Sequence, residues 1–259
     1  MLSWSRQKQL SILGTLGGIV VLLGALLYLL FLKPTASCTD GVKSGDELGV
    51  DCGGSCKRVC PLEVSALRTI WTRIFSVSPR TYDVAALIEN SNVGYAVPSL
   101  RYTFKVYDDR NVLIVERDGT TFVNEKERFV VFEPVIDVGE RIPTHATLTF
   151  ETVNWVRHTN GKSSRDAQPA FNIQNKRFVV SPKPRLTAEL LGDPLRDAHG
   201  VEVRAVVYDG DGTAVGVSST LIDTVKKGSI EQLFFTWQEP FANGAVATEL
   251  YPRTNVLAP

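Results

Sequence analysis

The four cysteines of the chain lie within 23 residues, at Cys38, Cys52, Cys56 and Cys60. Their spacing is C-x13-C-x3-C-x3-C, whereas structural zinc sites commonly pair ligands as C-x2-C and often add histidine. No histidine lies in this segment, and the segment is poor in apolar residues. Two disulfides in an oxidising compartment are therefore the favoured interpretation, with zinc as the alternative. Four cysteines allow three pairings, and the sequence does not choose among them.

The same segment carries four carboxylates among glycines, at Asp40, Asp46, Glu47 and Asp51. Calcium takes six to eight oxygen ligands from carboxylates and carbonyls in a tight, glycine-bearing loop. Aspartate and glycine also build ordinary turns, and the spacing of an EF-hand is absent. The four acids thus predict turns, with a calcium site as the alternative; no other cofactor is expected.

The segment resembles a short Cys/Gly/Asp module of bacterial surface and secreted proteins, which often reads DGxxNGDExGVDCGGxCxxC. Ser44 stands where that module usually has asparagine, and the last cysteine gap is three residues rather than two. The resemblance implies an extracytoplasmic location and no particular activity. The matching positions are Cys38, Asp40, Gly41, Gly45, Asp46, Glu47, Gly49, Asp51, Cys52, Gly53, Gly54 and Cys56.

The cysteine segment follows a long apolar stretch, Leu10–Leu32, that contains no charged residue. At 1.5 Å per residue such a helix spans about 35 Å, enough to cross a hydrocarbon core of about 30 Å. A cleaved signal peptide is the alternative, but its apolar region is usually about 7–15 residues long. Lys33-Pro34 also separates the stretch from any cleavage point. We therefore predict an uncleaved transmembrane helix whose partner is the lipid bilayer.

Basic residues flank this helix almost equally, so charge does not decide its orientation. The clustered cysteines favour a cytoplasmic N-terminus and extracytoplasmic domains after the helix, in a single-pass plasma-membrane protein. Gly14 and Gly18 form a GxxxG pattern, which allows two membrane helices to approach closely. Self-association through this face is a further hypothesis.

The rest of the chain alternates apolar and polar residues in short runs that predict β-strands, with no convincing amphipathic helix. In the stretch 100–107, one face carries the apolar set and the opposite face the polar set. A second such stretch, 201–208, alternates in the same way, with Val201, Val203, Ala205 and Val207 on one face and Glu202, Arg204, Val206 and Tyr208 on the other. It ends in Asp209-Gly210-Asp211-Gly212, which predicts a type I′ hairpin turn, with calcium binding as the alternative. The two predicted faces of the first stretch are Leu100, Tyr102, Phe104 and Val106, and Arg101, Thr103, Lys105 and Tyr107.

These two stretches align with each other at an offset of 101 residues, FKVYDDRN against AVVYDGDG. Further matches follow, such as KERFVVFEP and IEQLFFTWQEP. The repeat predicts an all-β fold of two tandem immunoglobulin-like β-sandwiches, with a polar boundary near residues 159–168. The predicted organisation is a cytoplasmic tail at 1–9, the membrane helix at 10–32, a disulfide-stapled neck at 33–61, and sandwiches at 62–160 and 161–259.

The first repeat resembles the FxLYD domain family, whose naming residues appear as Phe104-Lys105-Val106-Tyr107-Asp108. The upstream LIENSN stretch fits the strand end of that family. The second repeat has Ala205 in place of the phenylalanine and is the more divergent copy. The resemblance covers about 70 residues of each half. It implies an immunoglobulin-like sandwich in an extracytoplasmic, bacterial or archaeal protein, without catalytic residues.

Several function classes are disfavoured. The chain holds 28 basic and 28 acidic residues, a balance that argues against a nucleic-acid partner. His145, His158 and His199 accompany no nucleophile motif and are expected to be exposed polar residues. Three tryptophans are expected to fill or rim the sandwiches, with a glycan platform as the alternative. These tryptophans are Trp71, Trp155 and Trp237.

The sequence thus predicts a membrane-anchored, extracytoplasmic protein with an interaction or envelope-structural role, and not an enzyme. Its expected partner is an envelope protein or a glycan. The first alternative is an accessory subunit of a membrane complex. The second is an enzyme with a site between the sandwiches, which requires clustered acids or histidines in a cleft.

Overall fold

The structure is a computed structural model that describes residues 4–31, 37–157, 168–241 and 244–258. The chain forms two compact units, residues 1–63 and 64–259. Nearly all of the predicted boundary, residues 159–167, lies outside the described residues. So does part of the predicted neck, including Lys33-Pro34, and His158.

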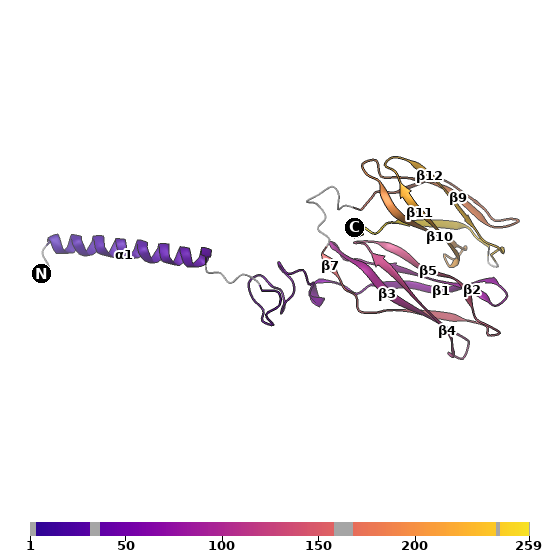
Figure 1. The fold of residues 1–259 in the computed structure, drawn as a ribbon, viewed down its shortest axis with the longest axis horizontal. Helices are drawn as coiled ribbons and strands as arrows, with labels where there is room; N and C mark the ends of the chain where they lie inside the picture. The colour runs from indigo at the N-terminus through magenta and orange to yellow at the C-terminus, as the bar shows by residue number, and fades with distance from the viewer. Residues whose placement is uncertain (1–3, 32–36, 158–167, 242–243, 259) are drawn as a thin grey trace. The chain divides into compact units, whose positions relative to one another are not determined.

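The first unit begins with α1 (Trp4–Phe31), a single helix (Figure 1). Within it, Ser11–Tyr28 is long and apolar enough to cross a membrane, and none of that stretch is buried in the protein. A helix needs about 20 such residues to span lipid, and signal sequences share this property. The helix begins earlier than the predicted Leu10, because the polar residues before it continue the same backbone hydrogen-bond ladder.

The neck follows from residue 37 and contains little regular structure. It has one isolated bridge between Gly49 and Cys52 and a short 3-10 helix, η1 (Pro61–Glu63). Its cysteines form two disulfides, Cys38–Cys56 and Cys52–Cys60. The prediction of two disulfides is confirmed, and the structure supplies the pairing.

The second unit starts with a β-sandwich of two antiparallel sheets. Strand order is β1-β2-β5 in one sheet and β4-β3-β6 in the other, with β7 added to β3. The bounds are β1 (Arg68–Ser78), β2 (Thr81–Glu89), β3 (Tyr95–Tyr107), β4 (Leu113–Val123), β5 (Arg128–Asp137), β6 (His145–Phe150) and β7 (Val156–Arg157).

A second sandwich follows, with strand orders β12-β9-β8 and β11-β10-β13. Its strands are β8 (Asn172–Val179), β9 (Arg185–Leu191), β10 (Ala198–Tyr208), β11 (Ala214–Val225), β12 (Ile230–Thr236) and β13 (Ala247–Arg253). The order β8 to β13 repeats the topology of β1 to β6 strand for strand. The expectation of two tandem β-sandwiches is confirmed.

The repeat extends to a matching pair of hairpin turns. The Asp108 carboxylate accepts hydrogen bonds from the backbone N–H groups two and four residues ahead, at 3.0 and 2.9 Å. Asp209, its counterpart 101 positions later, does the same at 3.0 and 2.8 Å. In both turns the third residue after the aspartate has a positive φ, 59° at Asn111 and 74° at Gly212.

This geometry corrects the type I′ prediction for the second turn. A type I′ turn needs positive φ at two successive residues, but only Gly212 has it among the residues of this loop. Gly212 donates its N–H to Asp209 O at 3.2 Å, and Asp209 N–H bonds Thr213 O at 2.9 Å. The loop is therefore a type I turn followed by a left-handed residue, the usual three-residue hairpin.

Alternation along the strands is as predicted in β3, whose apolar set is buried and whose opposite face is half-buried or exposed. Leu100, Tyr102, Phe104 and Val106 lie in the core of the first sandwich together with residues of β2 and β5. The second sandwich has its own core, which includes Leu186, Leu190 and Phe235.

The two sandwiches pack face to face, an arrangement that the sequence does not predict. In Figure 1 the sheet of β10 and β11 lies against that of β1, β2 and β5. The face of β10 that carries Val206 and Tyr208 meets the first sandwich and not solvent. The apolar cluster between the sheets comprises Phe75, Ala85, Leu87, Val130, Val206, Ala214 and Val217, flanked by Trp71, Phe132, Tyr208 and Tyr251.

Candidate functional site

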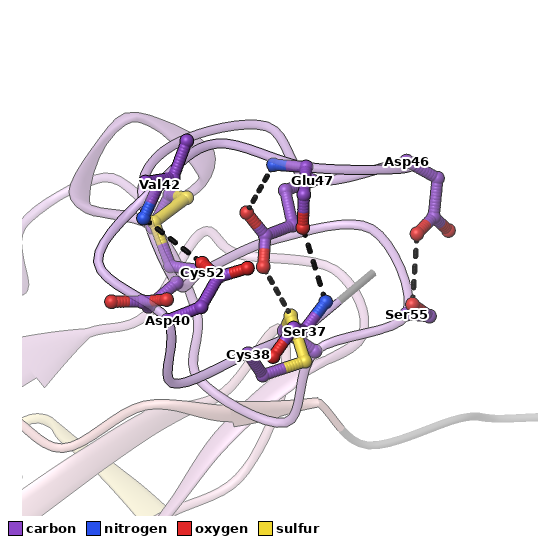
Figure 2. Close-up of a disulfide and its surroundings, with 12 residues drawn as sticks. Ser37, Cys38, Asp40, Val42, Asp46, Glu47, Cys52 and Ser55 are labelled. Carbon is purple, nitrogen blue, oxygen red and sulfur yellow. Dashed lines mark hydrogen bonds between the residues drawn. A yellow bond between two sulfur atoms is a disulfide. The ribbon is translucent and has the colours of Figure 1, made fainter. Parts of the chain in front are cut away.

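The disulfide-bonded neck is the first place where the sequence predicts a site. Figure 2 shows Glu47 beside the Cys38–Cys56 disulfide, with its Oε1 3.2 Å from Cys56 Sγ. Because a disulfide sulfur carries no hydrogen, this is a contact and not a hydrogen bond. The three residues bring ligand-type atoms within 4.8 Å of one another, but both sulfurs are joined to each other and offer no thiolate.

Each of the four neck carboxylates accepts a local hydrogen bond. Asp51 accepts from Gly41 N–H at 3.0 Å, and Asp40 accepts from Val42 N–H at 2.9 Å. Glu47 accepts from the Ser44 N–H at 2.9 Å, and Asp46 accepts from the Ser55 hydroxyl at 2.8 Å. These bonds are those of turns, and within the described residues the four carboxylates do not form one ligand cluster. The calcium site stays a prediction.

The second place is a cleft of about 870 Å³ between the two sandwiches. Ligand sites commonly enclose about 300–1,000 Å³. One wall is the consecutive run Arg73–Ser78 of β1 and the other is the consecutive run Ala214–Ser219 of β11. If the face of a sheet formed the wall, only every second residue of the strand would line the cleft. Because consecutive residues line it, the edge of each strand forms the wall.

The floor of the cleft continues the apolar cluster between the sandwiches. Phe75, Phe132, Ala214 and Val217 belong both to that cluster and to the cleft lining. A molecule in the cleft therefore meets apolar surface at its base and strand edges at its sides.

An aromatic lip closes the side of the cleft next to β11. The Trp237 indole N–H donates to Val217 O at 3.2 Å, and the Trp237 and Phe241 rings lie 5.6 Å apart in an edge-to-face arrangement. Both rings lie over Gly216, where an added Cβ would come within 2.5 Å of the Phe241 ring. Any side chain at position 216 would collide with these rings, which explains the glycine there.

Asp83 is the carboxylate at the base of this cleft. It lies on β2 directly opposite Phe75 and accepts a hydrogen bond from Val135 N–H at 2.9 Å. Burial raises the pKa of Asp83, and the bond from Val135 opposes this effect. Within the described ranges, no basic side chain is close enough to form an ion pair with Asp83. The carboxylate is thus partly desolvated without a cation.

Val135 itself is held in an unfavourable conformation. Its φ is 56°, and its side chain is 66% exposed. A β-branched residue is seldom left-handed, and such strain tends to occur where a structure serves a site. The bulge between Tyr82 and Val84 in the β2–β5 register places this residue against Asp83.

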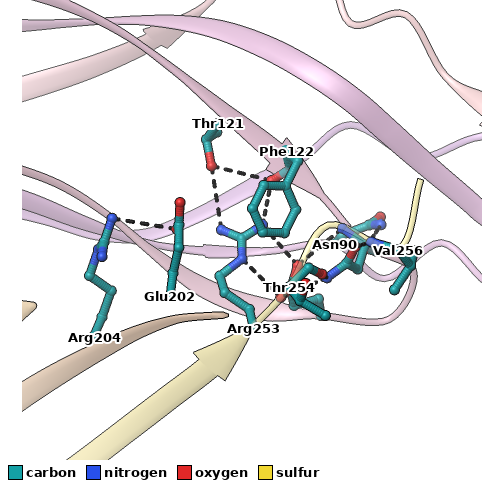
Figure 3. Close-up of polar contacts among 10 residues, drawn as sticks. Asn90, Thr121, Phe122, Glu202, Arg204, Arg253, Thr254 and Val256 are labelled. Carbon is teal, nitrogen blue, oxygen red and sulfur yellow. Dashed lines mark hydrogen bonds and ion pairs between the residues drawn. The ribbon is translucent and has the colours of Figure 1, made fainter. Parts of the chain in front are cut away.

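The opposite end of the interface carries a buried charge pair between the sandwiches. Figure 3 shows Arg253 of β13 pointing into the first sandwich, where its Nε lies 3.1 Å from Glu127 Oε1. The guanidinium lies 3.8 Å from the Phe122 ring centroid and 4.3 Å from that of Phe129. Burial raises the pKa of Glu127 and lowers that of Arg253.

The segment after Arg253 joins the same polar cluster. Asn124 donates its side-chain N–H to Thr254 O at 3.0 Å and accepts from Val256 N–H at 3.4 Å. The Asn90 side-chain N–H donates to the backbone carbonyl of Asn124 at 2.7 Å. The LIENSN strand end therefore contributes to this polar junction between the sandwiches. The sequence gives no signal for this pair. Glu127 lies between Lys126 and Arg128 just before β5, and Arg253 is the last residue of β13.

The remaining predicted residues lie apart from the cleft. His145 stacks on Tyr107 at 5.2 Å, and His199 bonds the Thr224 hydroxyl at 3.0 Å; both are exposed. Cβ atoms built at Gly14 and Gly18 would meet nothing within 4 Å, so the helix surface there is open. Of the three tryptophans, Trp71 and Trp237 border the two sides of the interface, and Trp155 packs on the first core.

Comparison with protein-family models and with curated proteins finds no match to this chain. The resemblance to the FxLYD family and to the Cys/Gly/Asp module therefore remains a prediction based on the residues alone.

Proposed function

We propose that this chain is a membrane-anchored protein that presents its two sandwiches outside the membrane and binds a partner of the cell envelope in the cleft between them. The observation that carries the proposal is the cleft itself. It combines an apolar floor, two strand edges and an unpaired carboxylate in one place.

The anchor and the location are supported by the first unit. α1 contains one stretch suited to crossing lipid, and the two neck disulfides suit an oxidising compartment. In this proposal the neck is a compact spacer between bilayer and sandwiches, because the disulfides hold a segment that has too little apolar material for a core.

Binding is favoured over catalysis by the content of the cleft. Acid–base catalysis commonly uses a pair of groups whose pKa values are set for donating and accepting a proton. The described lining residues include Asp83 and Glu239 but no histidine. Burial raises the pKa of Asp83, and Glu239 is exposed.

The experiment is photo-crosslinking in living cells from a benzophenone amino acid placed at Gln238, an exposed residue on the cleft lip. The matched control carries the same amino acid at Lys227, an exposed residue of the β11–β12 turn. We expect a specific adduct from position 238 that is absent from position 227. The proposal is contradicted if the two positions give the same products or none.

The alternative of an accessory subunit in a membrane complex is distinguished by the same method at Gly18. Adducts from position 18 to another membrane protein, together with none from position 238, favour that alternative.

A further inference from the structure

We infer that the cleft receives an extended polypeptide segment that adds as a strand to the outer edge of β1, with a lysine or arginine side chain paired to Asp83. This inference rests on the proposed function and names the class of ligand. It specifies an edge and a charge pattern.

The edge of β1 is the first reason. β1 pairs with β2 alone, and no other strand of the described chain pairs with its outer edge. An unpaired strand edge presents a row of N–H and C=O groups that a second strand can bond. The run Arg73–Ser78 that lines the cleft offers about 20 Å of such an edge at about 3.3 Å per residue.

The opposing edge of β11 is less available. Val217 O already accepts the Trp237 indole N–H, and the aromatic lip covers Gly216. Covering an edge in this way is how proteins prevent strand addition. Among the described residues, no side chain hydrogen-bonds the backbone of the run Arg73–Ser78, so the two walls differ and the added strand belongs on β1.

The charge pattern comes from the register of β1 on β2. Asp83 of β2 pairs with Phe75 of β1, so β1 lies between Asp83 and a strand added to the outer edge. Adjacent strands are about 4.8 Å apart, which places Asp83 about 10 Å from an added strand. Among natural side chains, lysine and arginine combine that reach with a positive charge, and their methylene stems can lie over the Phe75 ring.

Arg73 supplies the complementary half of the pattern. It is exposed, lines the cleft and lies on the same face of β1 as Phe75, two residues away. No ion pair of Arg73 occurs with another described residue. A residue of the added strand opposite Arg73 is therefore acidic, two positions from the basic residue.

The test uses the full-length protein in lipid nanodiscs and a displayed library of random nonapeptides as the probe. Selected peptides are expected to carry a basic and an acidic residue two positions apart in a frame rich in β-branched residues. Asp83→Asn keeps an acceptor for Val135 N–H and should weaken the best peptide about tenfold, the scale of one charge-assisted pair. Asp223→Asn, an exposed carboxylate of β11 outside the cleft, should leave binding unchanged.

Backbone methylation supplies the second readout. A strand bonds its neighbour through every other residue, so N-methyl groups at alternate positions of the selected peptide should abolish binding while those between are tolerated. An effect of methylation without this period, or equal binding to the Asp83→Asn variant, overturns the inference. If the peptide results fail but cells still give the adduct from position 238, the proposed function survives and only the ligand class is wrong. If the adduct is also missing, both the inference and the proposed function are refuted.

Discussion

Arg253 is the side chain whose surroundings are most demanding. It is 1% exposed, lies between two phenylalanine rings and faces Glu127, which is 7% exposed. Removing one partner of a buried pair leaves a charge without compensation and costs about 3–5 kcal/mol. We expect Arg253→Met to lower the free energy of unfolding by that amount, measured by urea denaturation.

The double variant with Arg253→Met and Glu127→Gln provides the control for this prediction. It removes the uncompensated charge while keeping an amide for the Asn124 N–H, which donates to Glu127 at 3.0 Å. Part of the lost stability should return. A loss below about 1 kcal/mol in the single variant would show that the pair does not stabilise the junction.

Asp83 yields a prediction with a pH dependence. Burial raises its pKa above the usual 3.8 of an aspartate, so the folded state holds this proton more tightly than the unfolded state. Its contribution to stability therefore falls as pH rises from about 3.8 through the raised folded pKa, and the cost stays constant above that range. Asp83→Asn should be more thermostable than the parent at pH 7 and not at pH 3, in melting curves recorded at both values.

A lower melting temperature of Asp83→Asn at pH 7 would contradict this account of Asp83. Residues of binding sites often reduce the stability of the free protein. A higher melting temperature of Asp83→Asn at pH 7 would therefore also support the cleft as a site.

At the scale of elements, the paired hairpin turns provide a matched comparison. Gly212 has φ 74° and Asn111, its counterpart, has φ 59°. The left-handed region costs a β-branched residue on the order of 1–2 kcal/mol, whereas asparagine tolerates it. We expect Gly212→Val to cost that amount in denaturant unfolding and Asn111→Gly to be nearly neutral.

Gly210 is the control within the same turn. It lacks a positive φ, and an added Cβ there would meet nothing within 4 Å. Gly210→Ala should therefore be neutral or slightly stabilising. If Gly210→Ala costs as much as Gly212→Val, the turn does not have the geometry described above.

Elements also show how far the sequence predicts this structure. Period-two alternation predicted β3 correctly, because one face of that strand meets the core and the other meets solvent. The same rule misassigned Val206, because the face that it shares with Tyr208 is covered by another sheet. The run Ala205-Val206-Val207 is apolar on both faces, which is the sequence signature of a strand buried on both sides.

The cleft and the polar junction could not be predicted for a related reason. Asp83 and Phe75 are neighbours through strand pairing, and the β11 wall that faces them is more than 130 positions further along the chain. Arg253 and Glu127 are 126 positions apart. Local patterns carry no information about which sheet faces pack together, so these sites emerged only from the tertiary structure.

At the scale of the whole molecule, the shared apolar cluster predicts that the two sandwiches unfold together. Val206 is fully buried, and it is covered only because the sandwiches are in contact. Val206→Asp should separate them, since an unpaired charge there is strongly disfavoured. We expect one calorimetric transition in the parent and two in the variant, with Val246→Asp, at an exposed position, as the control. Two transitions in the parent would refute the coupling.

The central claim is that everything after α1 lies outside the membrane in an oxidising compartment. It is tested by adding a membrane-impermeant maleimide–polyethylene glycol to intact cells, with and without prior treatment by an impermeant reductant. All four cysteines are in disulfides, so we predict no adduct before reduction and four adducts after it, without lysis. Adducts that form without reduction, or only after the cells are lysed, would contradict the account.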